Sequence, residues 1–373
     1  MSAACSDDSP VARLLDECAQ AAPAAAPAIA QTLLALVKVL HRRAAAAAAD
    51  EVAREHAKHI AAALARIGPE QDGEICFALW TPAIAETTRL IERGEAEAAL
   101  VQLAAMLRDA GLPAKEPEPT GPIDRLWSDG RFVSIDSSGR PAPLGGDCRW
   151  YRLPGIRDKF VLPTREVILD NADVEVMWPA PLDHGVPEHV LNEAQHAMIE
   201  AVRWIGEVSP RHLAWIDRLV CGFAITEMPE DSDLSSGSYK SRPGVVHISF
   251  PLDPVMVAET LIHEASHQHY LLLNSVVPLV DPEATEFVFS PIKGCERPLV
   301  RCAFAHHACF NIWDFMRRAL SGRYGVQAGE RMVLMAGYTE VLGMNVLASG
   351  RLTEAGTAFL GGLQAQTLLP EAA

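Results

Sequence analysis

The segment 263–267, with the sequence HEASH, constrains this chain more than any other feature. It follows Asp253 and Pro254, a typical helix start, because aspartate accepts hydrogen bonds from the first turn and proline fits the first helical position. A helix from 254 to about 273 would place His263 and His267 on one face, one turn apart. Two imidazoles in this arrangement can bind one divalent metal ion. The sequence therefore predicts a metal-binding helix.

Glu264 follows the first of these histidines and is expected to lie beside the metal rather than on it. In metallohydrolases a glutamate at this position acts as the general base on a metal-bound water. His269 is expected to face elsewhere on the helix, so we interpret it as a structural or surface residue.

A catalytic metal needs a third protein ligand, with positions left open for water or substrate. Glu286 follows the motif at a spacing compatible with zinc peptidases, but it lies in a stretch typical of extended chain, and Asp281 is similar. His306 and His307 lie on a predicted apolar helix from about 298 to 320, where adjacent side chains point about 100° apart. At most one of these two histidines can then face the metal. We favour His307 as the third ligand and keep His306 and Glu286 as alternatives.

The predicted fold class is α+β and predominantly helical. Residues 1–112 are predicted to form a helical N-terminal region, since apolar residues recur at spacings of three and four. Residues 113–122 contain four prolines, which favours a linker. Residues 123–373 are predicted to form a mixed α/β metal-binding catalytic domain. It combines a small β-sheet, a hairpin turn at 128–130 and strands at 160–162, 174–177 and 245–250 with a helical C-terminal half. The order of a strand followed by the HExxH helix is similar to that of zincins.

The composition excludes several classes of partner. The formal net charge is −16, which repels nucleic acids and anionic membranes. No uncharged apolar run is long enough to span a bilayer, and no signal peptide is visible. The eight cysteines are scattered and form no CxxC pair, so we expect reduced thiols and a cytoplasmic location.

Several blocks between about 236 and 320 resemble one specific family. They are 243–249 (PGVVHIS), 258–270 (AETLIHEASHQHY), Ser290-Pro291, Arg297-Pro298 and His307 on the following helix. Together they resemble the HExxH motif-containing peptide-modification proteins, described as α-ketoglutarate-dependent HExxH-type peptide β-hydroxylases. The resemblance covers roughly a quarter of the chain. Ile292 and Lys293 depart from the family, which has aromatic and basic residues after Ser-Pro.

The resemblance implies Fe(II), α-ketoglutarate and O₂ as metal and cosubstrates, and β-carbon hydroxylation of a ribosomally synthesised precursor peptide. It implies Arg297 as the residue that binds the distal carboxylate of α-ketoglutarate in a bidentate manner, with Lys293 and Arg301 as alternatives. Ser290 would donate a hydrogen bond to this cosubstrate. Glu264 would then orient water or a ligand near the metal.

Two other functions stay open at this point. The motif alone also predicts a zinc metallopeptidase with Glu264 as the general base. A non-enzymatic peptide-binding protein with a structural metal is the third hypothesis. The substrate peptide is not identified by the sequence, and a homodimer is left open.

Overall fold

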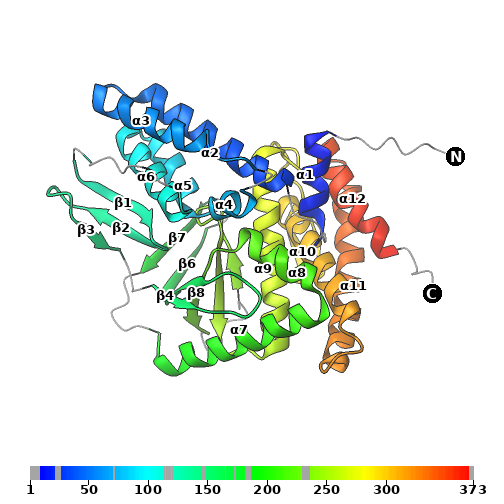
Figure 1. The fold of residues 1–373 in the computed structure, drawn as a ribbon. Coiled ribbons are helices and arrows are strands. Elements are labelled where there is room, and N and C mark those ends of the chain that lie inside the picture. Colours follow the sequence, from blue (N-terminus) through cyan, green and yellow to red (C-terminus); the bar gives the residue numbers. More distant parts are fainter. Residues whose placement is uncertain are drawn as a thin grey trace. The chain divides into compact units, whose positions relative to one another are not determined.

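The computed structural model describes residues 9–21, 27–69, 72–112, 114, 119, 121–144, 148–163, 165–171, 174–180, 186–228 and 236–368, with 165–171 and 174–180 described as backbone only. Within these ranges the chain forms twelve helices and twelve mostly short strands (Figure 1). This confirms the predicted fold class, α+β and predominantly helical. The predicted linker at 113–122 lies largely outside the described residues.

Two compact units make up the chain, and their segments interleave along the sequence. Unit 1 consists of Met1–Ala24, Glu200–Ile216 and Asp253–Ala373, and unit 2 of Ala25–Ile199 and Asp217–Leu252. The units differ from the predicted parts, because most of the N-terminal helices belong to the same unit as the strands that follow residue 122. The chain passes between the units within α7 (Glu188–Val208) and α8 (Pro210–Leu219).

Unit 2 begins with five helices, followed by an antiparallel sheet of three strands. The helices are α2 (Pro27–Ala47), α3 (Glu51–Leu64), α4 (Gly73–Ala78), α5 (Pro82–Glu92) and α6 (Ala96–Asp109). The strands are β1 (Ile123–Ser128), β2 (Arg131–Ile135) and β3 (Pro141–Pro143), in that order. The predicted turn at 128–130 is confirmed: Asp129 and Gly130 have φ of 50° and 73°, which a tight hairpin of this kind requires.

A second sheet in unit 2 has five strands in the order β4-β5-β8-β10-β9. Its members are β4 (Arg149–Tyr151), β5 (Lys159–Pro163), β8 (Gly222–Glu227), β10 (Val245–Phe250) and β9 (Ser236–Ser238). The three central strands are parallel and buried, and the two edge strands are antiparallel to their neighbours. A separate hairpin joins β6 (Arg165–Asn171) to β7 (Val174–Ala180). The strands predicted at 160–162, 174–177 and 245–250 are thereby confirmed.

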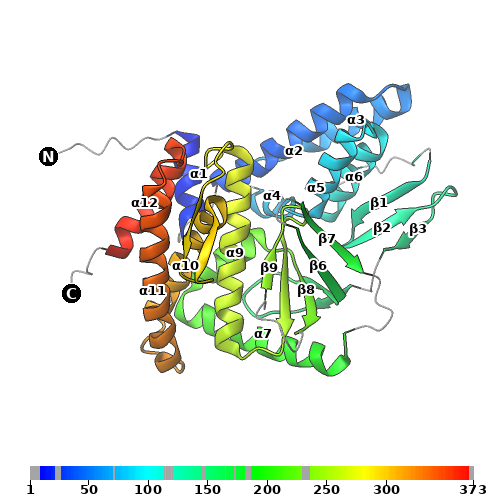
Figure 2. The ribbon, with the colours of Figure 1, turned by 180° about the vertical axis from the view of Figure 1, so that it is seen from behind.

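Unit 1 is helical apart from one hairpin. Its elements are α1 (Pro10–Ala19), α9 (Pro254–Val276), β11 (Phe287–Ser290), β12 (Cys295–Pro298), α10 (Leu299–Arg318), α11 (Gly325–Ala348) and α12 (Glu354–Leu368). Helix α10 packs against α9 and α11, and α1 packs against α9 and α12 (Figure 2). The helices predicted to contain the HExxH motif and the histidine pair 306–307 are confirmed. The sequence predicted only extended chain around Glu286, and the structure has a hairpin of β11 and β12 directly after that residue.

In the part of the chain that the structure describes, no helix combines the length and apolarity needed to cross a bilayer. The seven cysteines within that part are all free thiols.

One buried side chain, that of Gln102, connects α6 to the first sheet of unit 2. Its Nε2 donates to the carbonyl oxygen of Trp127 and its Oε1 accepts from the backbone N–H of the same residue, both at 2.7 Å. Gln102 is fully buried, so no water replaces these bonds if the amide is lost. Together with the packing of α5 and α6 on β1, this pair of bonds joins the N-terminal helices to the strands.

We expect Gln102→Leu to destabilise unit 2 by about 2 kcal/mol or more, because it leaves a buried N–H and a buried carbonyl without partners. Urea unfolding followed by circular dichroism would measure the change. Gln327→Leu, on the exposed side of α11, is the control and should change the midpoint little. An unchanged midpoint for Gln102→Leu would contradict the role of this side chain.

Candidate metal centre

Helix α9 carries the candidate centre, and its first turn forms as the sequence predicts. The side chain of Asp253 accepts from the backbone N–H groups of Val255 and Met256 at 2.9 and 3.0 Å, and Pro254 occupies the first turn. Between Val257 and Tyr270 every side chain of this helix is buried except that of His263. The helix therefore holds the motif among packed side chains, and His263 is the residue of this stretch that reaches solvent.

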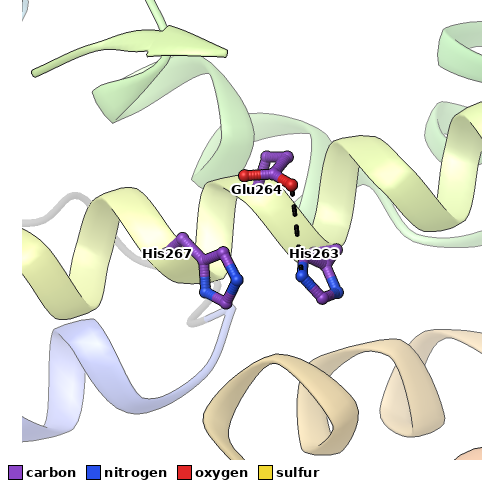
Figure 3. A group of neighbouring side chains, drawn as sticks. All are labelled: His263, Glu264 and His267. Carbon is purple, nitrogen blue, oxygen red and sulfur yellow. Dashed lines mark ion pairs between the residues drawn. The ribbon is translucent and has the colours of Figure 1, made fainter. Parts of the chain in front are cut away.

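Three donor side chains come together on α9: His263, Glu264 and His267. One ligand atom from each lies within 4.8 Å of the other two, and within the described ranges no further histidine, cysteine or acidic residue joins this group. Nε2 of His263 lies 4.0 Å from Oε1 of Glu264. The imidazoles of His263 and His267 meet edge to face at a centroid distance of 4.3 Å. Figure 3 shows both rings and the carboxylate turned toward a common space.

The protonation of His267 suits a metal ligand. Burial lowers its pKa well below the usual value, and electrostatic interactions with His263, His307 and Arg301 lower it further. The imidazole is therefore neutral at physiological pH, with a nitrogen lone pair available for a metal. A divalent ion between the three donors would place charge where two imidazoles and a carboxylate already converge, so these residues fit a metal.

Two contacts on α9 border the group. One turn before His263, the carboxylate of Glu259 accepts from Nε and Nη2 of Arg331 on α11, with the Nε bond at 2.6 Å. Beside His267, the ring of Phe304 on α10 lies parallel to the imidazole, at 3.7 Å between centroids and 11° between planes. The sequence analysis identified neither contact, since only their helical positions could be predicted and not which helices meet.

His307 does not join the three donors, although the sequence favoured it as the third ligand. Its Nε2 lies 2.9 Å from the carbonyl oxygen of Ala19 at the end of α1, so this nitrogen is committed to a backbone bond. The side chain of Asn311 donates to the same carbonyl at 3.1 Å. His306 also lies elsewhere, with its Nε2 3.2 Å from Oε1 of Gln364 on α12. Both histidines connect helices of unit 1.

The acidic candidates downstream of the motif are bound by one arginine. Nη1 of Arg351 lies 3.0 Å from Asp281 and its Nε lies 2.9 Å from Glu286. These ion pairs hold the segment between α9 and β11 against the start of α12. Neither Asp281 nor Glu286 joins the three donors, and Glu264 is therefore the carboxylate of this centre.

The residues that the resemblance assigned to α-ketoglutarate lie on or next to the β11–β12 hairpin. Ser290 is buried at the end of β11, where its carbonyl accepts from the N–H of Gly294 at 2.9 Å. Lys293 is exposed in the turn, and Arg297 is half-buried on β12 opposite Val288. The alternative, Arg301, lies in the first turn of α10, and its charge contributes to the lowered pKa of His267. Arg301 is exposed on that turn, and its electrostatic effect on His267 connects it to the donor group.

His269 has the structural role that the sequence analysis gave it. Its ring stacks on that of Trp215 at 4.1 Å and 5°, and its Nε2 lies 3.1 Å from the carbonyl oxygen of the same residue. It therefore holds α8 and α9 together within unit 1.

The chain matches no protein-family model, and no curated protein matches it.

We expect the purified protein to bind about one equivalent of a divalent metal, and His263→Ala and His267→Ala to bind it at least about 100-fold more weakly, since each removes a donor. Elemental analysis and competition with a chromogenic chelator would measure this. His196→Ala removes an exposed helical histidine and should keep the wild-type stoichiometry. Full metal binding by both donor variants would exclude the site.

The pH dependence of stability gives a second test, made on metal-free protein. Burial lowers the pKa of His306 to about 4, partly offset by its hydrogen bond to Gln364. The unfolded chain binds this proton near pH 6.5, so folding stability is complete above that pH and is lost as the pH falls toward 4. We expect His306→Gln to reduce this loss by up to about 1.4 kcal/mol per pH unit. Urea unfolding at pH 7.5 and 5.0 measures it, and an identical pH dependence in the variant would contradict the assignment.

Proposed function

We propose that this protein is a non-haem Fe(II) oxygenase that uses α-ketoglutarate and O₂ to hydroxylate a ribosomally synthesised peptide at a β-carbon. One observation carries the proposal: the donor group contains two imidazoles and one carboxylate, from His263, His267 and Glu264. Two histidines and a carboxylate are the ligands typical of non-haem Fe(II) oxygenases, which keep the remaining positions open. In this proposal Glu264 takes the ligand role that the sequence analysis gave to His307.

The bound iron would couple oxidative decarboxylation of α-ketoglutarate to insertion of one oxygen atom of O₂ into a C–H bond, giving succinate, CO₂ and a hydroxylated peptide. The residues of the chain hold the donors in place and limit water. Glu264 and His267 are buried, so they lie away from bulk solvent, and His263 has 31% of its side chain exposed. Substrate and cosubstrate would approach from the side of His263.

Arg301 is the residue we propose for the distal carboxylate of α-ketoglutarate. A guanidinium binds a carboxylate through two parallel hydrogen bonds, and Arg301 is close enough to act on the pKa of His267. This supports Arg301 over Arg297, which the resemblance had favoured. Ser290 and Lys293 belong to the hairpin that leads into α10 and stay candidates for polar contacts.

The peptide substrate and the cytoplasmic location are proposed from the sequence. The resemblance supports a precursor peptide, and the free thiols fit a reducing compartment. The net charge of −16 supports a partner that is not a nucleic acid.

A zinc metallopeptidase is the second candidate, and the position of Glu264 favours it. Oε1 of this residue lies 4.0 Å from Nε2 of His263, which would put the carboxylate within reach of a water on a metal held by the two histidines, as a general base requires. The two functions assign different roles to one carboxylate. In the oxygenase Glu264 holds the metal, and in the peptidase it accepts a proton from bound water.

We expect anaerobic protein with Fe(II) and α-ketoglutarate to show a weak visible charge-transfer band, and to form succinate when O₂ is admitted. A peptide product would be 16 Da heavier, the mass of one oxygen atom. If neither the band nor succinate appears in protein that holds iron, the oxygenase proposal is wrong.

Glu264→Gln separates the two candidates. In the oxygenase the variant should bind Fe(II) at least about 10-fold more weakly, because it loses an anionic donor. In the peptidase it should keep about one equivalent of zinc and lose peptide cleavage. His196→Ala serves again as the control for surface changes.

A further inference from the structure

The ring of Phe304 is the aromatic side chain most closely stacked on a donor of the candidate centre. It lies parallel to the imidazole of His267 with 3.7 Å between centroids, which is close face-to-face contact. Phe304 belongs to α10 and His267 to α9, so the contact joins two helices within unit 1. Because one ring covers the whole face of the other, it limits rotation of the imidazole about its bond to Cβ.

This contact takes the place of a hydrogen bond that metal-binding histidines normally have. Such a histidine almost always donates its second ring N–H to a carboxylate, a carbonyl or water, which fixes the orientation of the ring. Nδ1 of His267 is buried and has no hydrogen-bond partner among the residues that the structure describes. In Figure 3 one ring nitrogen of His267 points toward His263 and the other is turned away from it. The usual orienting bond is therefore missing where the stacking occurs.

Phe304 is itself held in position. The ring of Tyr270, one turn after His267 on α9, meets Phe304 edge to face at 5.0 Å and 90°. Tyr270 is buried, so its ring is fixed by packing. The ring of His263 also meets His267 edge to face, at 4.3 Å between centroids. The imidazole is thus confined by aromatic contacts on its face and its edge.

We propose that Phe304 is a positioning residue for the metal: it orients His267 by stacking, in place of a hydrogen bond to Nδ1. The inference rests on the metal centre that the proposed function uses, and it holds whichever metal and reaction that centre supports. It also predicts that the affinity of the centre for a metal ion depends on the flat aromatic ring of Phe304. A purely structural role for Phe304 would instead lower stability and leave the bound metal unaffected.

Co²⁺ is the probe for this experiment, because its visible absorption reports the geometry of its ligands. Phe304→Leu removes the flat face and keeps most of the apolar volume. We expect Co²⁺ to bind this variant about 10-fold more weakly, the lower end of the effect of losing an orienting partner, and with a changed absorption spectrum. Phe304→Tyr and Phe304→Trp keep an aromatic face and should restore both the affinity and the spectrum.

Phe310→Leu is the matched control, since Phe310 is buried on the same helix and its ring contacts Trp313. It should lose thermal stability and keep the wild-type affinity for Co²⁺. Wild-type affinity and spectrum in Phe304→Leu would overturn the proposal, as would an equal loss of affinity in Phe310→Leu. If Phe304→Leu fails to fold, Phe304→Met tests the same loss of a flat ring with a more adaptable side chain.

The outcomes also separate this inference from the proposed function. A wild-type protein that binds neither Co²⁺ nor Fe²⁺ would remove the metal centre and with it both proposals. A protein that binds metal, shows the Phe304 effect and forms no succinate would overturn the oxygenase and leave the positioning role in place.

Discussion

The enclosure of α9 is the constraint on which the rest of unit 1 depends. A helix that is buried nearly all round needs packing partners on every side, and within unit 1 α1 and α10 supply two of them. The same enclosure makes polar side chains on α9 costly unless each is matched. The ring of His269 stacks on Trp215, and Glu259 forms an ion pair with Arg331. His263, Glu264 and His267 form a group whose ligand atoms are close enough together to share one metal ion.

Local spacing predicted the parts of the site that lie on one helix. Asp253 and Pro254 fixed where α9 begins, and the interval of four residues placed His263 and His267 together, because both depend only on helix geometry. The contacts of α10 could not be predicted in this way. His307 was chosen as a ligand for its helix and its residue type, but which side chains of α10 meet the donors depends on packing between helices. Phe304, three residues earlier, stacks on His267, whereas His307 binds the carbonyl oxygen of Ala19 and its ring contacts Tyr270.

The fold shows the same difference between features set within short segments and features set by packing between distant segments. Turn residues and short apolar runs predicted the hairpin at Asp129-Gly130 and the central strands, since these are properties of short segments. The order of the five-stranded sheet and the interleaving of the units depend on contacts between distant residues. The bonds from Gln102 to Trp127 are an example: a glutamine on a helix carries no sign in the sequence of the strand that it will bind.

The bond between His307 and Ala19 has a consequence for how the protein is made. It joins residues 288 positions apart, and Asn311 adds a second bond to the same carbonyl. Helix α1 leaves the ribosome early, yet its partners α9, α10 and α12 are synthesised much later. Contacts between residues so distant in sequence form slowly. Unit 2 can therefore begin to fold before α1 meets the helices that it packs against. Unit 1, which contains the candidate metal centre, is therefore expected to be the last part to assemble during translation.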